Sequence, residues 1–340
     1  MSCFNVVFKT IVALIFIFAT VLIPPPARAG EAKQLILGHI GAPGTMYDLT
    51  ANEFARRVNA KLAGRYEIVV KGNSSIGDDE AMLSQVRKGE ICFSLPFAPL
   101  AKAMPIFAAF DLPYLILTRN HIRDVRAALV ETYLKPEAEK NGLALVAMWE
   151  NGFRHVTSSG HAVEGPRDLR GLKLRIPPGS WRSQIFQSFG ANITEIPLKK
   201  LYDALKNKEV DGEENTLTII SSSNYSDVQQ YLSLTAHSYQ PIFLVASNER
   251  FSHLEPDVRQ VIISVSKDLE NWALDIGARE DLKQLSELRK KMIVNDPDKF
   301  SFLVASIPIY QEFARQIPNG IAIVKMLYDP SSFGASLVEN

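Results

Sequence analysis

The stretch DLRGLKLRIP, residues 168–177, says most about how this chain folds. Apolar and basic side chains alternate from Leu172 to Ile176, which is the period of a β-strand, and Pro177-Pro178 ends that strand. The carboxyl end of a strand in an open α/β sheet is where such folds place ligands. We therefore expect Arg175 to face a ligand cleft, although the pattern alone also allows an exposed strand residue.

On both sides of this strand, apolar strands alternate with amphipathic helices. The pattern predicts strands at Leu35–Gly38, Tyr66–Lys71, Ile91–Leu95, Leu143–Trp149, Leu172–Ile176, Val210–Glu213 and Ser238–Ser247. It predicts helices at Tyr47–Leu62, Asp79–Lys88, Asn120–Lys140, Ser180–Phe189, Leu198–Asn207, Pro256–Met292 and Phe300–Gln316. Continuous apolar strands favour parallel sheets that are covered on both faces, and Pro241 favours an edge or crossover position for its strand.

The first thirty residues have the pattern of a secretory signal peptide. Lys9 precedes an apolar run from Ile11 to Ile23, and three prolines and Ala27-Arg28-Ala29 follow. We predict cleavage after Ala29. The alternative is an uncleaved membrane anchor, but the run is short for crossing about 30 Å of hydrocarbon.

Charge and cysteine content exclude several classes of protein. The chain has 37 basic and 37 acidic residues, and removing Lys9 and Arg28 with the signal peptide leaves 35 against 37. This balance argues against a nucleic-acid partner or a polybasic membrane patch. Cys92 is the only cysteine after cleavage, so no internal disulfide is expected.

No sequence motif signals catalysis, a cofactor or a metal. G-x-S-x-G, H-E-x-x-H and the phosphate-binding G-x-x-x-x-G-K are all missing, and the six histidines are scattered. An exported two-lobed α/β protein of this kind fits a solute receptor that closes on its ligand. The alternative is a secreted enzyme or ligand-sensing module using the same cleft, where Tyr47, Asp79 and Glu214 are the available acid–base groups.

Four segments in order resemble one family. Residues 168–177 resemble the D-L-K-G-L-K-x-R-x-P signature of TRAP transporter solute receptors of the DctP type. IGDDEAML (76–83), FDLPYL (110–115) and VDGEEN (210–215) resemble three further elements of that family. The resemblance covers essentially the whole mature chain.

This resemblance implies a fold and a function. The fold is two-lobed and periplasmic-binding-protein-like, with a ligand cleft between the lobes and a long C-terminal helix bracing them. Such receptors capture organic acids, mostly carboxylates, in the periplasm and deliver them to a two-part membrane permease driven by a sodium gradient. We expect a monomer without a cofactor.

The resemblance also assigns ligand contacts. Arg175 matches the arginine that forms the main salt bridge to the ligand carboxylate, which a guanidinium grips with two parallel hydrogen bonds. Arg154, in NGFRHVT (151–157), matches a second contact, or else is a structural arginine bonded to backbone carbonyls. Asn215 is expected to donate to the ligand, while Glu213 and Glu214 are expected to orient an arginine.

The remaining predicted lining residues set the ligand class. Phe97 stands where members that bind large sugar acids carry an acidic residue, so we expect no acid-lined subpocket. Phe97 and Trp181 suit an apolar or aromatic body if both face the cleft, and otherwise pack in the core or at the rim. Tyr47 and Asp79 complete the predicted site. We therefore expect a small carboxylate with an apolar, keto or aromatic body.

The pattern also suggests lobe boundaries. Lobe I would comprise residues 30–151 and about 241–280, and lobe II residues 152–240 and about 281–328. Residues 329–340 would form a loosely ordered tail. The chain would cross between lobes near residues 151–152 and 240–241 and along the helix from Pro256.

Overall fold

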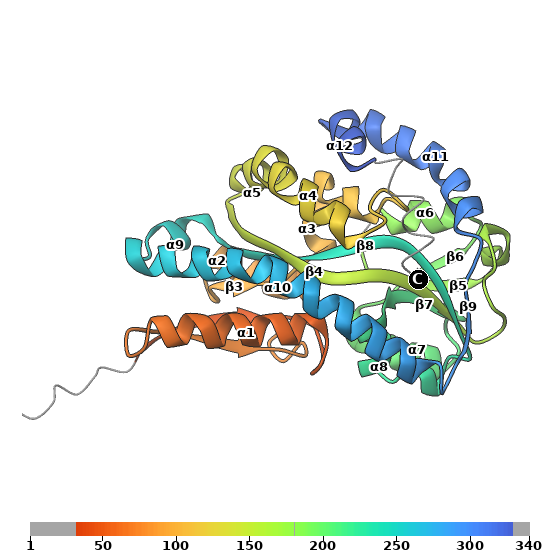
Figure 1. Cartoon of the computed structure of the whole chain (residues 1–340), viewed down its shortest axis with the longest axis horizontal. Coiled ribbons are helices and arrows are strands. Elements are labelled where there is room, and N and C mark those ends of the chain that lie inside the picture. The colour runs from red at the N-terminus through yellow and green to blue at the C-terminus, as the bar shows by residue number, and fades with distance from the viewer. Residues whose placement is uncertain (1–31, 180, 329–340) are drawn as a thin grey trace, which may run out of the picture.

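The computed structural model describes residues 32–179 and 181–328 (Figure 1). The predicted signal peptide, the predicted helix start at Ser180 and the predicted tail lie outside these residues. Within them, no helix combines the length and apolarity needed to cross a membrane.

The described strands form one mixed sheet rather than purely parallel ones. Its order is β2-β1-β3-β8-β4-β7-β5-β6, and β9 pairs with β8. The strands are β1 Lys33–Gly38, β2 Tyr66–Lys71, β3 Phe93–Ser94, β4 Leu143–Ser158, β5 Lys173–Ile176, β6 Asn192–Glu195, β7 Gly212–Thr216, β8 Tyr231–Ser247 and β9 Ile293–Asn295. Four parallel pairs lie at the two ends of the sheet, β9 pairs parallel with β8, and the antiparallel pairs involve β4 and β8.

Strands β4 and β8 are about twice as long as predicted, and they join the two ends of the sheet (Figure 1). Their pairing is interrupted between Glu150 and Gly152, opposite Pro241 and Gln240. Gly152 has φ +121°, which side-chain-bearing residues rarely adopt. At Pro241, strand β8 has β4 on one side and no strand on the other. The N–H that proline lacks is therefore not needed for pairing with a second strand, which agrees with the predicted edge or crossover position.

Most helices lie where they were predicted. The helices that line or brace the molecule are α1 Met46–Lys61, α2 Asp79–Lys88, α6 Arg182–Ser188, α7 Leu198–Lys206, α10 Pro256–Leu288 and α11 Lys299–Gln316. Asp78 caps α2 by accepting a hydrogen bond from the Ala81 N–H at 2.9 Å, and Gly89 ends the helix with φ +71°. These two local signals set the bounds of α2.

The predicted helix over Asn120–Lys140 is divided into three parts. These are α4 Arg119–Leu129, the π-helical turn η2 Val130–Leu134 and α5 Lys135–Lys140. Pro136 cannot donate the hydrogen bond that an α-helix needs at that point, and the widened turn lies directly before it.

Several short elements were not predicted because they are too short to show a period. They are α3 Ala98–Ala103, η1 Pro105–Asp111, η3 Pro166–Leu169, α8 Leu217–Ser222, η4 Tyr225–Asp227, α9 Asn248–Ser252 and α12 Gly320–Leu327.

Two apolar cores cover opposite faces of the sheet. Neighbouring residues of a strand point to opposite faces, and Met148 belongs to one core while Trp149 belongs to the other. Helix α10 crosses the sheet and contacts β4, α1 and α8 (Figure 1). It therefore braces both ends of the molecule, as the predicted long C-terminal helix should.

Candidate functional site

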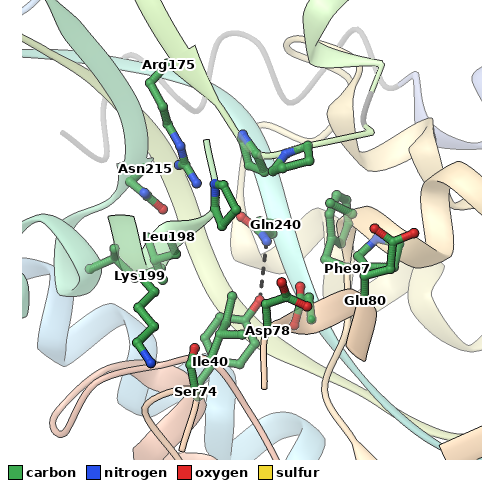
Figure 2. Close-up of a pocket in the computed structure, with 18 of the residues that line it drawn as sticks. Ile40, Ser74, Asp78, Glu80, Phe97, Arg175, Leu198, Lys199, Asn215 and Gln240 are labelled. Carbon is green, nitrogen blue, oxygen red and sulfur yellow. Dashed lines mark hydrogen bonds between the residues drawn. The ribbon is translucent and has the colours of Figure 1, made fainter. Parts of the chain in front are cut away.

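A pocket lies where the middle of β4 and β8 meets the carboxyl end of β5, and its cavity volume is about 140 Å³ (Figure 2). Six of the seven predicted site residues line it: Tyr47, Asp79, Phe97, Arg154, Arg175 and Asn215. Sheet register explains how distant segments converge there. Arg175 pairs with Glu213 of β7, while Arg154 of β4 pairs with Thr216, the residue after Asn215.

Arg175 is a buried cation in the pocket wall that has no ion-pair partner among the described residues. Its side chain is 2% exposed, its Nε donates to the Ile196 carbonyl oxygen at 2.7 Å, and its buried Nη1 has no partner among the described residues. Burial lowers the pKa of Arg175 to about 10. Pro177 and Pro178 end β5 beside it and also line the pocket. The guanidinium is therefore held in place with hydrogen-bonding capacity left for a ligand.

Asn215 lies beside Arg175 in the pocket wall (Figure 2). Its Nδ2 donates to Glu213 Oε2 at 3.0 Å, and Glu213 Oε1 accepts from Thr157 Oγ1 at 3.0 Å. Burial raises the pKa of Glu213 to about 7, and the Arg175 guanidinium opposes that shift. Glu213 thus orients the amide of Asn215.

Arg154 lines the pocket, and each of its three nitrogens already has a partner. Nε pairs with Glu214, Nη1 donates to Gln240, and Nη2 donates to Glu214 Oε1 at 2.8 Å. Arg154 Nη2 also donates to the backbone carbonyl oxygen of Glu214. These contacts fit a structural arginine, although most of the partners are side-chain oxygens of Glu214 and Gln240 rather than backbone carbonyls.

Phe97 and Tyr47 form the apolar and neutral part of the wall. Phe97 is 1% exposed and stacks on Phe243 with ring centroids 6.0 Å apart. The Tyr47 hydroxyl accepts a hydrogen bond from Gln240 Nε2 at 3.5 Å, which Figure 2 shows as a dashed line. Burial raises the pKa of Tyr47, so its hydroxyl stays protonated.

Acidic side chains line one side of the pocket, and the expectation of no acidic subpocket is wrong. Asp78, Asp79 and Glu80 lie at the start of α2, and Figure 2 shows Asp78 and Glu80 away from Arg175. Burial raises the pKa of Asp79 to about 7, while a hydrogen bond from the Phe97 backbone opposes the shift. The sequence argument looked for an acidic subpocket only at position 97, and although it placed Asp79 in the site, it did not consider Asp78 and Glu80 beside it.

Trp181 is not among the residues that line this pocket. Its ring is 8% exposed and packs edge-on against Phe313 of α11 at 5.1 Å. The alternative of core packing therefore describes Trp181.

Its neighbour Arg182 was missed by the sequence analysis, yet it lines the pocket with a side chain that is 1% exposed. Arg182 Nη2 lies 2.7 Å from Asp111 Oδ1, and its guanidinium lies over the Phe97 ring at 5.0 Å. Two signals could have found this pair. Asp111 is an isolated charge in an apolar run, which requires a buried partner, and Arg182 starts the helix that follows the ligand-facing strand.

The described residues offer no group of three or more His, Cys, Asp or Glu side chains placed to hold a metal ion. The pocket therefore combines guanidinium and amide donors at one end with apolar, hydroxyl and carboxyl groups around it. Such a set can bind and orient a small anion.

Comparison with known proteins agrees with this geometry. Residues 37–316 match the family model described as bacterial extracellular solute-binding protein, family 7. The 2,3-diketo-L-gulonate-binding periplasmic protein of Escherichia coli K12 is 28% identical, over 86% of this chain and 91% of that protein. The C4-dicarboxylate-binding protein of Bacillus subtilis 168 is 28% identical, over 84% of each chain.

Solved structures show the same fold. A TRAP periplasmic solute-binding protein from Polaromonas sp. JS666, bound to D-erythronate, superposes with a TM-score of 0.81 at 27% identity. The superposition covers 87% of this chain and 98% of that one.

Proposed function

The chain belongs to family 7 of the bacterial extracellular solute-binding proteins, and from this premise we propose that it binds a small organic-acid anion in the pocket at Arg175. It is a receptor of the TRAP type rather than an enzyme, and it delivers its ligand to a membrane permease. Similar proteins bind mono- and dicarboxylates, so the general ligand class is an organic acid.

One observation supports the proposed position of the carboxylate. Arg154 is ion-paired with Glu214 and Arg182 with Asp111, whereas no described carboxylate lies within ion-pair distance of Arg175. Leaving a buried charge unpaired costs several kcal/mol. A ligand carboxylate would supply the missing charge and accept from the unpartnered Nη1.

The other lining residues then take secondary roles. Asn215 donates to the carboxylate or a neighbouring oxygen, Phe97 packs against the ligand body, and Tyr47 and Asp79 close the opposite wall. Arg154 holds Glu214 and Gln240 in position and does not grip the ligand.

The cellular setting follows the same proposal. The family is extracytoplasmic, and we propose export through cleavage after Ala29. The mature protein acts as a monomer in the periplasm. Lobe I comprises residues 30–151 and about 241–280, lobe II comprises residues 152–240 and about 281–328, and the tail follows.

The test compares Arg175→Ala and Arg175→Lys with the unchanged protein. A thermal-shift panel of organic acids, amino acids and neutral sugars first finds a ligand, and calorimetry then measures its affinity. Removing one partner of a buried charge pair should cost about 2–5 kcal/mol of binding free energy. Lysine should restore little, because it cannot form two parallel hydrogen bonds.

Arg167→Ala is the matched control, because Arg167 is exposed in η3 and lies outside the pocket. It should bind like the unchanged protein. Full affinity in Arg175→Ala would show that the carboxylate lies elsewhere, and stabilisation by amino acids or sugars alone would overturn the ligand class.

A further inference from the structure

Arg182 lines the pocket and forms a buried ion pair with Asp111, which is not itself a lining residue. Asp111 is the last residue of η1 and is 1% exposed, and Arg182 is the first residue of α6. The distance of 2.7 Å between Arg182 Nη2 and Asp111 Oδ1 lets each charge compensate the other. Burial raises the pKa of Asp111, and the Arg182 guanidinium opposes that shift.

Arg182 nevertheless keeps hydrogen-bonding capacity. Nη2 is engaged by Asp111, but Nε and Nη1 are buried without a hydrogen-bond partner in the described residues. Buried donors of this kind are normally satisfied by a ligand or by water. Because its charge is already balanced, Arg182 can satisfy these donors with a neutral oxygen.

The charges around the pocket leave room for one negative charge only. Burial opposes ionisation of Glu214, but Arg154 and Arg182 lower its pKa below the usual range, so Glu214 balances Arg154. Asp111 balances Arg182, whose Nη1 also lies 3.8 Å from Glu214 Oε1, and Arg175 remains without a carboxylate partner. Asp79 and Glu213 add negative charge whenever they ionise.

The rim gives a second, independent argument. Asp78 and Glu80 are exposed on the side away from Arg175, where the far end of an anchored ligand would lie (Figure 2). Glu80 is paired with Lys102 Nζ at 3.2 Å, which leaves Asp78 as the rim acid without an ion-pair partner among the described residues, so a second carboxylate there would meet its negative charge.

We propose that the ligand is a monocarboxylate carrying an oxo or hydroxyl oxygen, with its carboxylate on Arg175 and its neutral oxygen on Arg182. Arg182 is thus a specificity-determining residue, and Asp111 is the residue that makes the site reject dicarboxylates. This inference rests on the proposed function, because it assumes that Arg175 holds a ligand carboxylate.

The experiment uses ligands matched in chain length and the full mature protein. Butanoate, 2-oxobutanoate, 2-hydroxybutanoate and butanedioate form one set, and the five- and six-carbon equivalents form two more. Calorimetry should show that an oxo or hydroxy monocarboxylate binds about tenfold or more tightly than both the plain acid and the dicarboxylate of its set.

Asp111→Asn separates charge from shape, because it preserves the side-chain volume while removing the negative charge. Arg182 then becomes a second unbalanced cation, and the ratio of dicarboxylate to monocarboxylate affinity should rise about tenfold or more. The double variant Asp111→Asn/Arg182→Gln removes both charges together. The double variant should lose the preference for oxo and hydroxy acids over plain acids. Because it leaves no unpaired buried charge from this pair, it serves as the test when Asp111→Asn alone fails to fold.

Asp275→Asn is the control for removing an acid from an arginine pair, because Asp275 pairs with Arg123 at 2.8 Å outside this pocket. It should leave all ratios unchanged. A dicarboxylate preferred by the unchanged protein, or ratios that do not respond to Asp111→Asn and the double variant, would overturn the inference. Failure of every organic acid to bind would instead overturn the proposed function.

Discussion

At the scale of single residues, Asp79 links the pocket to pH. Its pKa near 7 lies well above the ordinary value of 3.8, because burial disfavours the carboxylate. Between about pH 4 and pH 7 the folded protein therefore binds a proton that the unfolded chain releases, and the stability contributed by Asp79 falls as pH rises through this window.

Asp79→Asn should remove this contribution. Relative to the unchanged protein, its free energy of unfolding should increase with pH by up to about 1.4 kcal/mol for each pH unit within that window. Urea unfolding at several pH values from 4.5 to 8 measures the difference. A difference between the two proteins that stays constant with pH would contradict the burial of the Asp79 carboxyl.

The site residues differ in how far the sequence could place them. Arg175 could be predicted because its strand alternates and ends at two prolines, so its position at the strand end follows from local pattern. Arg154 could be placed in the pocket but not given a role, because its partners Glu214 and Gln240 are 60 and 86 residues away. Arg182 and Asp111 are 71 positions apart by their residue numbers, so local signals could mark each residue as a candidate but could not show that the two are in contact.

At the scale of elements, local signals predicted helices well and long strands poorly. Helix α2 carries its own start and stop in Asp78 and Gly89, so its bounds were predictable. Strand β4 continues past its apolar half because β8 and β7 pair with residues 152–158, which include Arg154 and His155. Pairing between distant strands, rather than local propensity, decides where these strands end.

The contact between α10 and β4 depends on Gly277. A Cβ atom at this position would lie 2.6 Å from Glu150 Cγ, and Glu150 is fully buried and paired with Arg119 at 2.9 Å. Gly277→Leu should therefore lower the free energy of unfolding by about 1–3 kcal/mol through overpacking. Urea denaturation of the two proteins measures this change.

Arg279→Leu is the matched control, because it places the same side chain at an exposed position two residues along the same helix. Its effect should stay within about 0.5 kcal/mol. Equal stability of both variants would mean that α10 does not press on β4 at the interruption of the sheet.

At the scale of the whole molecule, three connections run between the two ends of the sheet. Strands β4 and β8 pair along their length with three register shifts, the middle one beside Gly152, and α10 contacts elements at both ends. The pocket lies at this interruption, since Arg154 and Gln240 line it from the two strands. A ligand that touches both proposed lobes can therefore stabilise one relative orientation of them.

Ligand binding should close the proposed lobes by bending at these connections. In the proposed division, Arg175 and Asn215 fall in lobe II and Tyr47, Asp79 and Phe97 in lobe I, so one bound anion should bridge both and favour the closed state. Small-angle scattering of the mature protein with a saturating organic acid should show a smaller radius of gyration than without it. Arg175→Ala at the same acid concentration should keep the ligand-free curve, because it lacks the guanidinium that retains the anion. Superimposable curves for the unchanged protein would show that the pocket fills without movement of the lobes.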